Sequence, residues 1–508
     1  MKKADSLMGV AKDPLRKKFL TSLKARVTLG EPELVPDHLL DSLFVHMVKE
    51  GINPRHLSSL AREGAKALRA YLERNERRKF PVGLKLLTLI RCYSLPEIVQ
   101  TILKRSKSRA LRDRMNELLK ANEKFIQRFA VTGFKNQGFD ETYSVLKKYG
   151  CDMGREKTYG RTLRDLFDYS ETPLQLEKKG LDMLTRELPT FKRLTTKLAK
   201  RFRCKPKAEE LAKAIRKKKS LKPKRVLGYL NEVRKHTVKV VNKHVVRVNP
   251  KYNTRVLETP TYLSGVIPSG AAFFLNYLTG KPLQLFLTTT DPRRSPHTVP
   301  AELLNLLIHE EYGHCVHGSN SSYAYGAKPA FIEMLTSLLG NSISEGMSFQ
   351  RELEFLDVLK RLARRKHFDE DEARFVKYIR RFGNYDSFTE EYEFFTRMWR
   401  IVRFLRVIGD ARINSGKQDL LDFLDWANEE TGLSKSLVYH QVFPAHQGIA
   451  PGYASTYAII GESIRKIQDA AKRKGKELRD LNTYACSMGF TPRSLFEERL
   501  KTYAGLGR

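Results

Sequence analysis

The first 190 residues carry apolar side chains at the three- and four-residue spacing that is typical of amphipathic helices. Residues 86–103 are a clear example of this period. Several such segments follow a proline, which commonly begins or interrupts a helix. These prolines are Pro36, Pro54, Pro81, Pro96 and Pro173. Residues 1–190 are therefore predicted to form a helical N-terminal region, and they show no repeat of fixed period.

The pattern changes after residue 250. Residues 255–291 show alternation and are rich in Thr and Phe, and residues 283–291 are the clearest predicted strand of the chain. The preceding segment 229–246 fits either a helix or a strand. The strand at 283–291 is a candidate sheet edge that holds an extended peptide by main-chain hydrogen bonds, and a plain structural strand is the alternative.

Helical periodicity returns at Pro300 and continues to the C-terminus. An apolar run over residues 303–308 predicts a buried helix with Pro300 and Glu302 in its first turn. The predicted fold class is therefore mainly α, with a small β-sheet before this helix. We expect three parts, which are a helical region at 1–190, a basic helical segment at 191–250 and a C-terminal region at 251–508.

Charge is distributed unevenly along the 508 residues. The net charge is +36, of which residues 1–250 carry +32 and the remainder only +4. Residues 192–225 are the most basic window and could bind a phosphate backbone. Phe191 and Phe202 are the only aromatic residues in or next to this window that could stack bases, and no nucleic-acid motif is present. The favoured interpretation is a solvated surface, so nucleic acid is a possible but not the preferred partner.

The cysteines and apolar runs predict a location. Five scattered cysteines without a Cys-x-x-Cys pair favour a reducing compartment. The N-terminal lysines are followed by no apolar segment, so no signal peptide is predicted. The longest apolar candidate, residues 266–278, is shorter than the roughly 18 residues of a membrane helix. We therefore expect a soluble cytoplasmic protein without a membrane partner.

A cluster of ionisable residues follows the apolar run at 303–308. It contains His309, Glu310, Glu311 and His314. Charged groups at the end of a buried helix are costly unless something compensates them, and a divalent metal does so. Two imidazoles bind zinc as neutral ligands, and a neighbouring carboxylate can take a proton from bound water. His309 and His314 are therefore candidate zinc ligands, and Glu310 is the candidate general base.

The five-residue step between the two histidines differs from the four-residue step of the His-Glu-x-x-His helix. In a regular α-helix, five residues separate the two rings by about 140°, against about 40° for four residues. A one-residue bulge brings the rings back together, and Gly313 tolerates such a distortion. The metal site therefore requires an irregular helix at this point.

A third protein ligand is expected from a second helix. Glu345 follows His314 by 31 residues, on a predicted helix that can cross the first one. Glu333 lies on the same approach and is the reserve candidate. The alternative is that all these residues are ordinary polar groups near helix ends.

Eight segments of the C-terminal half together resemble the domain-of-unknown-function family 885, a group of predicted gluzincin-like zinc metallopeptidases. They occur in the family's order within about residues 251–500. The segments are VLETPTYLSGVIPSG, TTTDP, HEEYGH, SEGMSF, RFLRVIGDARINSG, LDFLDWANEETGLS, APGYASTYAIIGES and FTPRSLFEERL. The HEEYGH segment alone is also similar to the zinc motif of dipeptidyl peptidase III.

The resemblance implies a helical gluzincin-like metallopeptidase fold with one zinc ion per chain. It implies His309, His314 and Glu345 as zinc ligands and Glu310 as the general base. Tyr457 matches a tyrosine that follows a Pro-Gly pair, and its hydroxyl is a candidate donor to the developing oxyanion.

Other candidate residues lie near the same motifs. Arg403, Arg406 and Asp410 match a basic-acidic helix of the family. Arg406 and Asp410 are four residues apart and can pair on one helix face. Arg403, Arg406 and Tyr453 are candidate substrate-binding residues.

The sequence departs from the family pattern at two positions. Cys315 stands where the family has a second histidine, and Asn414 stands where it commonly has another. His317 is therefore a further reserve ligand.

These observations predict a zinc-dependent metallopeptidase that acts on peptides rather than on folded proteins. Two other classes remain open. The chain could be a nucleic-acid-associated basic protein with a structural metal site, or a catalytically degenerate peptidase scaffold that binds partners.

Overall fold

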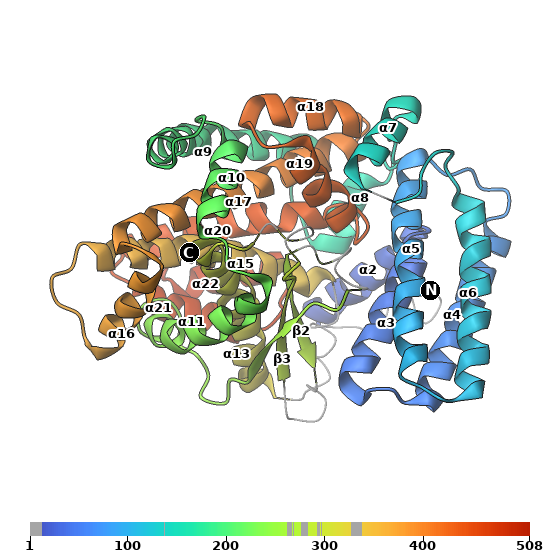
Figure 1. Cartoon of the computed structure of the whole chain (residues 1–508), viewed down its shortest axis with the longest axis horizontal. Coiled ribbons are helices and arrows are strands. Elements are labelled where there is room, and N and C mark those ends of the chain that lie inside the picture. The colour runs from blue at the N-terminus through green and yellow to red at the C-terminus, as the bar shows by residue number, and fades with distance from the viewer. Residues whose placement is uncertain are drawn as a thin grey trace.

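The fold is mainly helical, with one small three-stranded sheet, so the predicted fold class is confirmed. This computed structural model describes residues 13–136, 138–261, 267, 269–275, 283–291, 295, 297–326 and 338–507. A bundle of N-terminal helices stands beside a larger group of helices from the rest of the chain, and the sheet lies close to the boundary between them (Figure 1).

The N-terminal bundle consists of helices α3 to α6, and α2 leads into it. The bounds are α2 Pro14–Leu29, α3 Leu34–Glu50, α4 Pro54–Arg74, α5 Val82–Lys104 and α6 Arg109–Phe129. Pro54 is the first residue of α4, as the sequence predicts, behind the capping side chain of Asn53. The apolar faces of these helices belong to one hydrophobic core that continues into the C-terminal half.

Pro96 lies inside α5, so the prediction that it precedes a new helix is wrong. A proline within a helix has no N–H to donate to the carbonyl four residues earlier, which here belongs to Cys92. The buried side chain of Asn122 on α6 donates a hydrogen bond of 3.0 Å to that carbonyl oxygen. The neighbouring helix therefore supplies the donor that Pro96 lacks, and α5 continues unbroken.

By length and composition alone, α5 is also long and apolar enough to cross a membrane, and it is a stronger candidate than residues 266–278. More than half of its most apolar window is buried inside the protein. Such burial is common for core helices, so the apolar length of α5 is accounted for by packing.

Five helices connect the bundle to the C-terminal half. They are α7 Phe139–Tyr149, α8 Tyr159–Phe167, α9 Pro173–Phe202, α10 Ala208–Lys219 and α11 Pro223–His244. The ambiguous segment at 229–246 is therefore helical over most of its length. The division expected at residue 190 falls inside the continuous helix α9, which packs along the C-terminal helix α17 (Tyr385–Asn414).

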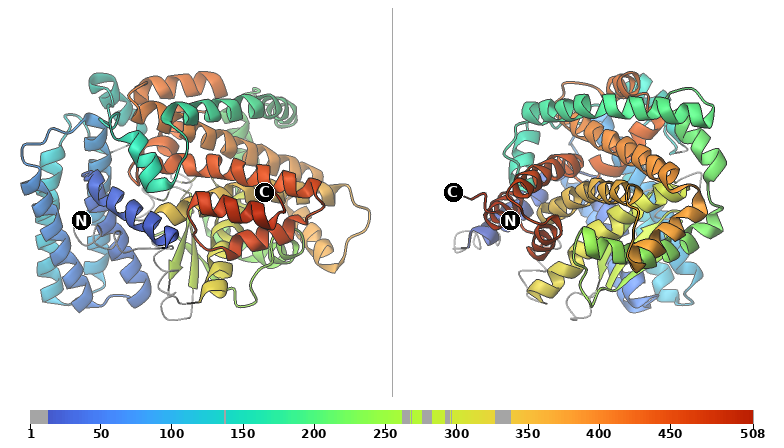
Figure 2. Two further views of the ribbon diagram at one scale, coloured as in Figure 1. Left: turned by 180° about the vertical axis from the view of Figure 1, so that it is seen from behind. Right: turned by 90° about the vertical axis from the view of Figure 1, so that its left-hand side faces the viewer.

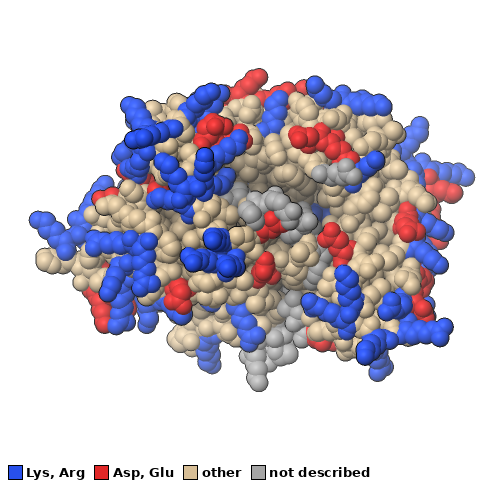
Figure 3. Space-filling model, in the orientation of Figure 1, with Lys and Arg blue, Asp and Glu red and all other residues tan. Residues whose placement is uncertain are grey.

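Lys and Arg side chains gather over α9 and α10 on the face shown in Figure 3. Several of them form ion pairs with the C-terminal half. Arg216 contacts Glu302 at 2.9 Å, and Lys219 contacts Glu391 at 2.6 Å. Part of the basic window thus binds the protein's own carboxylates, and nucleic-acid binding stays an untested prediction.

The sheet has the order β1–β3–β2, with β1 at Thr254–Glu258, β2 at Gly270–Leu275 and β3 at Leu283–Thr288. β1 runs parallel to β3, and β2 runs antiparallel to it. The predicted strand at 283–291 is confirmed, but it is the central strand, so it is not a sheet edge among the described residues. The strand at the edge nearest the cavity described below is β2.

The remaining helices of the described residues begin at Pro300, and most of them lie in the larger group of helices beside the N-terminal bundle (Figure 2). They are α12 Pro300–Leu307, η2 Ile308–Cys315, α13 Val316–Tyr325, α15 Leu338–Ala363, α16 Glu370–Ile379, η3 Arg380–Phe382, α17, α18 Leu420–Thr431, α19 Lys435–Val442, η4 Phe443–Gln447, η5 Tyr453–Ser455, α20 Thr456–Arg473, α21 Leu478–Ser487 and α22 Arg493–Tyr503. Helix α15 packs against η2, α17 and α20. It is therefore the central helix of this half.

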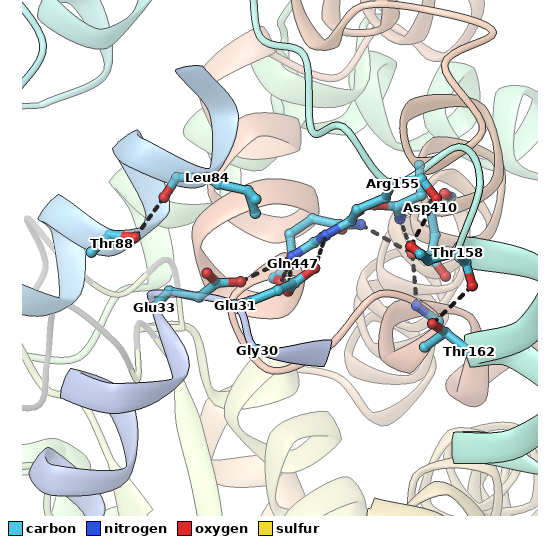
Figure 4. A network of polar contacts seen from close by, with 12 residues as sticks. Gly30, Glu31, Glu33, Leu84, Thr88, Arg155, Thr158, Thr162, Asp410 and Gln447 are labelled. Carbon is cyan, nitrogen blue, oxygen red and sulfur yellow. Dashed lines mark hydrogen bonds and ion pairs between the residues drawn. The ribbon is translucent and has the colours of Figure 1, made fainter. Parts of the chain in front are cut away.

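Arg155 connects the two ends of the chain through a buried network (Figure 4). Its guanidinium donates to Glu31 at 2.7 Å and to Glu33 at 2.9 Å, and both carboxylates come from the segment before α3. It also donates to Asn414 at 3.1 Å and Gln447 at 2.9 Å in the C-terminal half. One arginine thus joins the N-terminal bundle to the helices around the site.

Candidate metal centre

The two histidines of the HEEYGH segment lie on η2, which is a π-helix from Ile308 to Cys315. A π-helix repeats its hydrogen bonds every five residues, and such segments often occur at functional sites. A turn of this helix therefore holds more residues than an α-helical turn, so a five-residue step brings His309 and His314 closer to the same side than a regular α-helix would. Their ring centroids are 5.1 Å apart, with an angle of 81° between the ring planes. The predicted helix irregularity is confirmed.

Gly313 is needed for close packing more than for backbone freedom. A Cβ atom at this position would lie 2.2 Å from the Ser348 hydroxyl oxygen and 2.6 Å from the Ser348 Cα. Such distances are far below van der Waals contact, so only glycine allows η2 to approach α15 this closely. Gly313 has no positive φ, so its packing role replaces the conformational role predicted from the sequence.

Glu345 reaches the two histidines from α15, as predicted. Its Oε2 atom lies 3.7 Å from His309 Nε2 and 3.2 Å from His314 Nε2. One ligand atom from each of the three residues lies within 4.8 Å of the others, and all three residues are buried. The three candidate ligands therefore converge on one point.

These residues fit the zinc ion that the family resemblance implies. Glu345 Oε2 is buried and accepts no hydrogen bond within the part of the chain that the structure describes. Burial lowers the pKa of His309, but its contacts with Glu345 and Glu352 outweigh this effect and raise the pKa to about 9. The pKa of Glu345 is well below its usual value because the opposing charges of His314 and His309 outweigh burial. The site thus favours a positive charge between these side chains.

The outer nitrogens of both histidines are held by α15. His309 Nδ1 lies 2.8 Å from Glu352 Oε1, and a carboxylate oxygen only accepts, so Nδ1 carries the proton. His314 Nδ1 lies 2.8 Å from the Ser344 hydroxyl. Arg403 in turn contacts Glu352 at 2.7 Å. These contacts leave both Nε2 atoms directed at Glu345, which is the arrangement that metal-binding histidines require.

The neighbouring residues Glu310 and Glu311 have different surroundings. Glu310 is buried in the wall of the cavity beside the three ligands. Burial raises the pKa of Glu310, against the opposing effect of His309 and His314. Glu311 instead accepts hydrogen bonds from Arg234 at 2.7 Å and Tyr252 at 2.8 Å. The Glu310 carboxylate can therefore contact a water or substrate in the cavity, whereas Glu311 fixes η2 to α11.

A cavity of about 500 Å³ adjoins the candidate ligands. Its other walls come from α3, from β2 and from the segment around His446. Asp37 of α3 lines the cavity and is paired with Arg91 of α5 at 3.0 Å. The N-terminal bundle therefore completes the cavity, a role that no motif in residues 1–190 predicts.

Tyr453 and Tyr457 both line the cavity. The Tyr453 hydroxyl donates a hydrogen bond to Glu345 Oε1. The Tyr457 ring is stacked on His309, at 6.1 Å between centroids and 10° between planes, and its hydroxyl lies 3.3 Å from His446 Nε2. His446 Nδ1 faces the Gln441 carbonyl oxygen at 2.8 Å and must carry the proton. Its Nε2 therefore accepts from the Tyr457 hydroxyl.

Arg406 of α17 has a different partner from the one that its spacing predicts. Arg406 does not pair with Asp410, which instead accepts hydrogen bonds from Ser455 at 2.7 Å and Gly452 N at 3.0 Å. Arg406 donates to the side chain and backbone of Gln441 and lies over the Tyr457 ring at 4.7 Å. Burial lowers the pKa of Arg406 to about 10. Asp410 thus shapes the turn before Tyr453, and Arg406 remains in the cavity wall.

The reserve ligand His317 has contacts other than the three candidate ligands. His317 Nδ1 lies 3.2 Å from Ser344, and its Nε2 lies 3.0 Å from the Gly489 carbonyl oxygen. Glu333 lies outside the described residues. Asn414 donates to Asp410 at 2.7 Å and accepts from Arg155. The Asn414 side chain thus belongs to the buried network of Arg155.

Sequence reasoning missed Glu352, Ser344 and His446. Glu352 had a signal, because it follows Glu345 by seven residues and so lies two helical turns further on the same face. Ser344 directly precedes Glu345, but nothing in the sequence distinguished its hydroxyl. His446 lies in a turn-rich segment whose position relative to the histidines only the folded chain defines.

The fold has counterparts among solved structures. A chain from Shewanella oneidensis, provisionally described as a lipoprotein of unknown function, matches with a TM-score of 0.61 and 15% identity over 98% of this chain and 90% of that chain. A chain from Colwellia psychrerythraea, also provisionally described as a lipoprotein, matches with a TM-score of 0.58 and 13% identity over 88% of this chain and 74% of that chain.

Sequence comparison adds no family. No family model matches the chain, and no curated protein matches it. The resemblance to family 885 therefore stays a prediction. At these low identities the two structural neighbours show the fold alone.

Proposed function

We propose that the protein is a zinc-dependent hydrolase of peptides. The observation that carries this proposal is the convergence of His309, His314 and Glu345 on one buried point, beside Glu310 in the wall of a cavity. Two imidazoles, one carboxylate and an open position are the usual composition of a catalytic zinc site. Bound zinc would polarise the substrate carbonyl and lower the pKa of a bound water to about 7.

Each protein group then has a defined task in the reaction. Glu310 accepts a proton from the water while the oxygen of that water bonds to the peptide carbonyl carbon. Glu310 then donates the proton to the amine nitrogen when the C–N bond breaks. Glu352 and Ser344 hold the histidine rings in place. The Tyr457 hydroxyl turns from His446 and donates a hydrogen bond to the developing oxyanion.

The shape of the cavity supports a peptide as substrate. β2 is the outer strand of the sheet on the cavity side, and Ala271, Ala272 and Phe273 line the cavity. An extended peptide can add to such a strand by main-chain hydrogen bonds, which requires no particular side chain. A cavity of about 500 Å³ admits a short extended segment rather than a folded domain.

The test compares variants of three glutamates in the full-length chain, supplied with zinc and assayed with a mixture of unstructured peptides. Glu310→Gln is expected to keep the zinc at this centre and to lose peptide cleavage. Glu345→Gln is expected to lose the zinc at this centre. Glu429→Gln is the control, because Glu429 is an exposed glutamate of α18 outside the cavity, and it is expected to keep both zinc and cleavage.

Two results would contradict the proposal. Cleavage at the wild-type rate by Glu310→Gln would remove the assigned general base. A zinc-loaded wild-type chain that cleaves none of the peptides would instead favour the scaffold that binds partners without turnover.

A further inference from the structure

A second group of potential metal ligands lies at the end of the N-terminal bundle. His46 and Glu50 are four residues apart on α3, and His56 lies in the first turn of α4. One ligand atom from each residue lies within 4.8 Å of the others. The two helices are joined here by only three residues, from Gly51 to Asn53. The three side chains thus meet across a tight helix–helix connection.

The contacts within this group leave one nitrogen without a partner. His56 Nδ1 lies 2.7 Å from Glu50 Oε2, whereas His46 Nε2 lies 3.8 Å from the same oxygen. The two rings stand 5.5 Å apart at 75°. His46 Nε2 is buried and has no hydrogen-bond partner among the described residues, and its side chain is only 11% exposed. A buried nitrogen that faces a carboxylate without bonding to it requires an explanation.

A cation bound between the three side chains supplies that explanation. It would take the free electron pair of His46 Nε2 and one oxygen of Glu50, and it would replace the proton shared by Glu50 and His56. Two imidazoles and one carboxylate suit Zn²⁺, Ni²⁺ or Cu²⁺ better than Mg²⁺ or Ca²⁺, which prefer oxygen ligands. Glu50 and His56 are partly exposed, so water can complete the coordination.

We propose that His46, Glu50 and His56 form a second site for a late transition-metal dication, independent of the buried centre at His309. The metal would fasten the C-terminal end of α3 to the N-terminal end of α4. The first half of α3 carries Asp37 and Asp41, which line the cavity. The second metal would therefore hold in place a helix that forms part of the cavity wall.

The test measures zinc binding to the untagged full-length chain, first stripped of metal, by calorimetry and metal analysis. The wild type is expected to bind two zinc ions, one slowly removed by a chelator and one rapidly removed. His46→Gln and His56→Gln should each lose only the rapidly exchanging ion. Glu345→Gln should lose only the slowly exchanging ion. His367→Gln, at an exposed histidine outside both groups, should keep both ions.

Copper provides a second readout that does not depend on stability or turnover. In the Glu345→Gln background, bound Cu²⁺ should show the electron paramagnetic resonance signature of two imidazole nitrogens. The additional change His56→Gln should leave one.

The proposal is overturned if Glu345→Gln binds neither zinc nor copper, or if His46→Gln and His56→Gln retain the rapidly exchanging ion. The two centres can fail separately. If the single variant Glu345→Gln binds no zinc at all, the second site is disproved and the proposal for the buried centre is unaffected. If the single variant His56→Gln binds no zinc at all, the buried zinc centre is disproved and the second site is unaffected.

Discussion

Glu345 and Glu352 approach opposite nitrogens of the same imidazole. Glu345 Oε2 lies 3.7 Å from His309 Nε2, and Glu352 Oε1 lies 2.8 Å from His309 Nδ1. Both carboxylates project from α15, two turns apart. A single helix thus supplies both a candidate ligand and the group that orients the ring of another ligand, so displacement of α15 would disturb both together.

Glu352→Gln tests this relationship. The amide is a weaker acceptor for His309 Nδ1 and leaves Arg403 without its carboxylate, so zinc affinity at the buried centre is expected to fall about 10–100-fold. Chelator competition measures the affinity. Glu354→Gln is the control, because Glu354 lies on the same helix but accepts from Gln468 and Asn482 instead. Equal zinc affinity in the Glu352 variant and the wild type would disprove the orienting role.

Tyr457→Phe tests the proposed oxyanion donor. Removal of one such donor typically lowers kcat by about 10²–10³-fold and affects KM little. Zinc content should remain unchanged, because the Tyr457 ring stacks on the His309 ring and its hydroxyl is directed at His446 rather than at a candidate zinc ligand. Steady-state peptide cleavage with zinc analysis of the same sample provides the measurement. Tyr453→Phe is the comparison, and it should instead weaken zinc binding through the lost bond to Glu345. An unchanged kcat in Tyr457→Phe would exclude the donor role.

Gly313→Ala should destabilise the protein by about 1–3 kcal/mol, because the added methyl group overlaps Ser348 on α15. The zinc centre should be lost at a lower temperature than in the wild type. Gly228→Ala on α11 is the control, and it is expected to change the unfolding free energy in the opposite direction. A Cβ there meets nothing within 4 Å, so alanine should stabilise the helix by about 0.5–1 kcal/mol. Denaturant unfolding measures both, and equal stabilities would refute the packing argument.

Asn122→Leu tests how α5 tolerates Pro96. The change leaves the buried Cys92 carbonyl oxygen without the Asn122 donor and should cost about 1–3 kcal/mol of unfolding free energy. In a Pro96→Ala background, the new backbone N–H can bond to that oxygen, and the cost of Asn122→Leu should be smaller. A double-mutant cycle measures this coupling. Strict additivity of the two changes would show that Asn122 does not substitute for the missing N–H.

Glu171 should contribute stability that is lost in acid. Burial raises the pKa of Glu171, but hydrogen bonds and ion pairs with Arg493 and Lys179 outweigh it and lower the pKa to about 2. Because the folded pKa lies below the unfolded value of about 4.5, this stability is fully present above pH 4.5 and disappears as the pH falls towards 2. It amounts to about 3 kcal/mol, since each pKa unit corresponds to about 1.4 kcal/mol.

Glu171→Gln should therefore lower the unfolding free energy at pH 7 and flatten its fall between pH 4.5 and pH 2. Chemical unfolding at a series of pH values measures both effects. Glu370→Gln is the exposed control, because its ion pair with Arg374 is solvated and should contribute less than about 1 kcal/mol. The same pH profile for Glu171→Gln and the wild type would contradict the assignment.

The convergence of the candidate metal ligands was predictable because the signals for it are local. His309, Glu310 and His314 stand within six positions, and the five-residue step itself required an irregular helix. Glu345 followed from the need for a third ligand on a second helix. By contrast, the roles of Arg403 and Arg406 depend on Glu352 and Gln441, which only the packing of α15 and α19 against α17 brings within reach.

Some structural predictions were wrong because tertiary contacts override local signals. Pro96 does not end a helix, because Asn122 on another helix supplies the missing donor. The strand predicted at 283–291 is not at the edge of the described sheet, because a clear strand pattern in the sequence does not determine the position of that strand in the sheet. The contribution of the N-terminal bundle to the cavity has no sequence signal, because Asp37 reaches it only through the fold. The cytoplasmic location stays a prediction.

The network of Arg155 has a consequence for synthesis on the ribosome. Glu31 and Glu33 are synthesised before their partners, and burial raises the pKa of Glu33 well above its usual value. Their counter-ion emerges more than one hundred residues later, and Gln447 later still. Contacts of such long sequence separation slow folding. Glu31 and Glu33 therefore cannot be buried as an ion-paired group until the segment of Arg155 has folded against them, so a fragment that ends before residue 155 should leave this part of the N-terminal bundle unpacked.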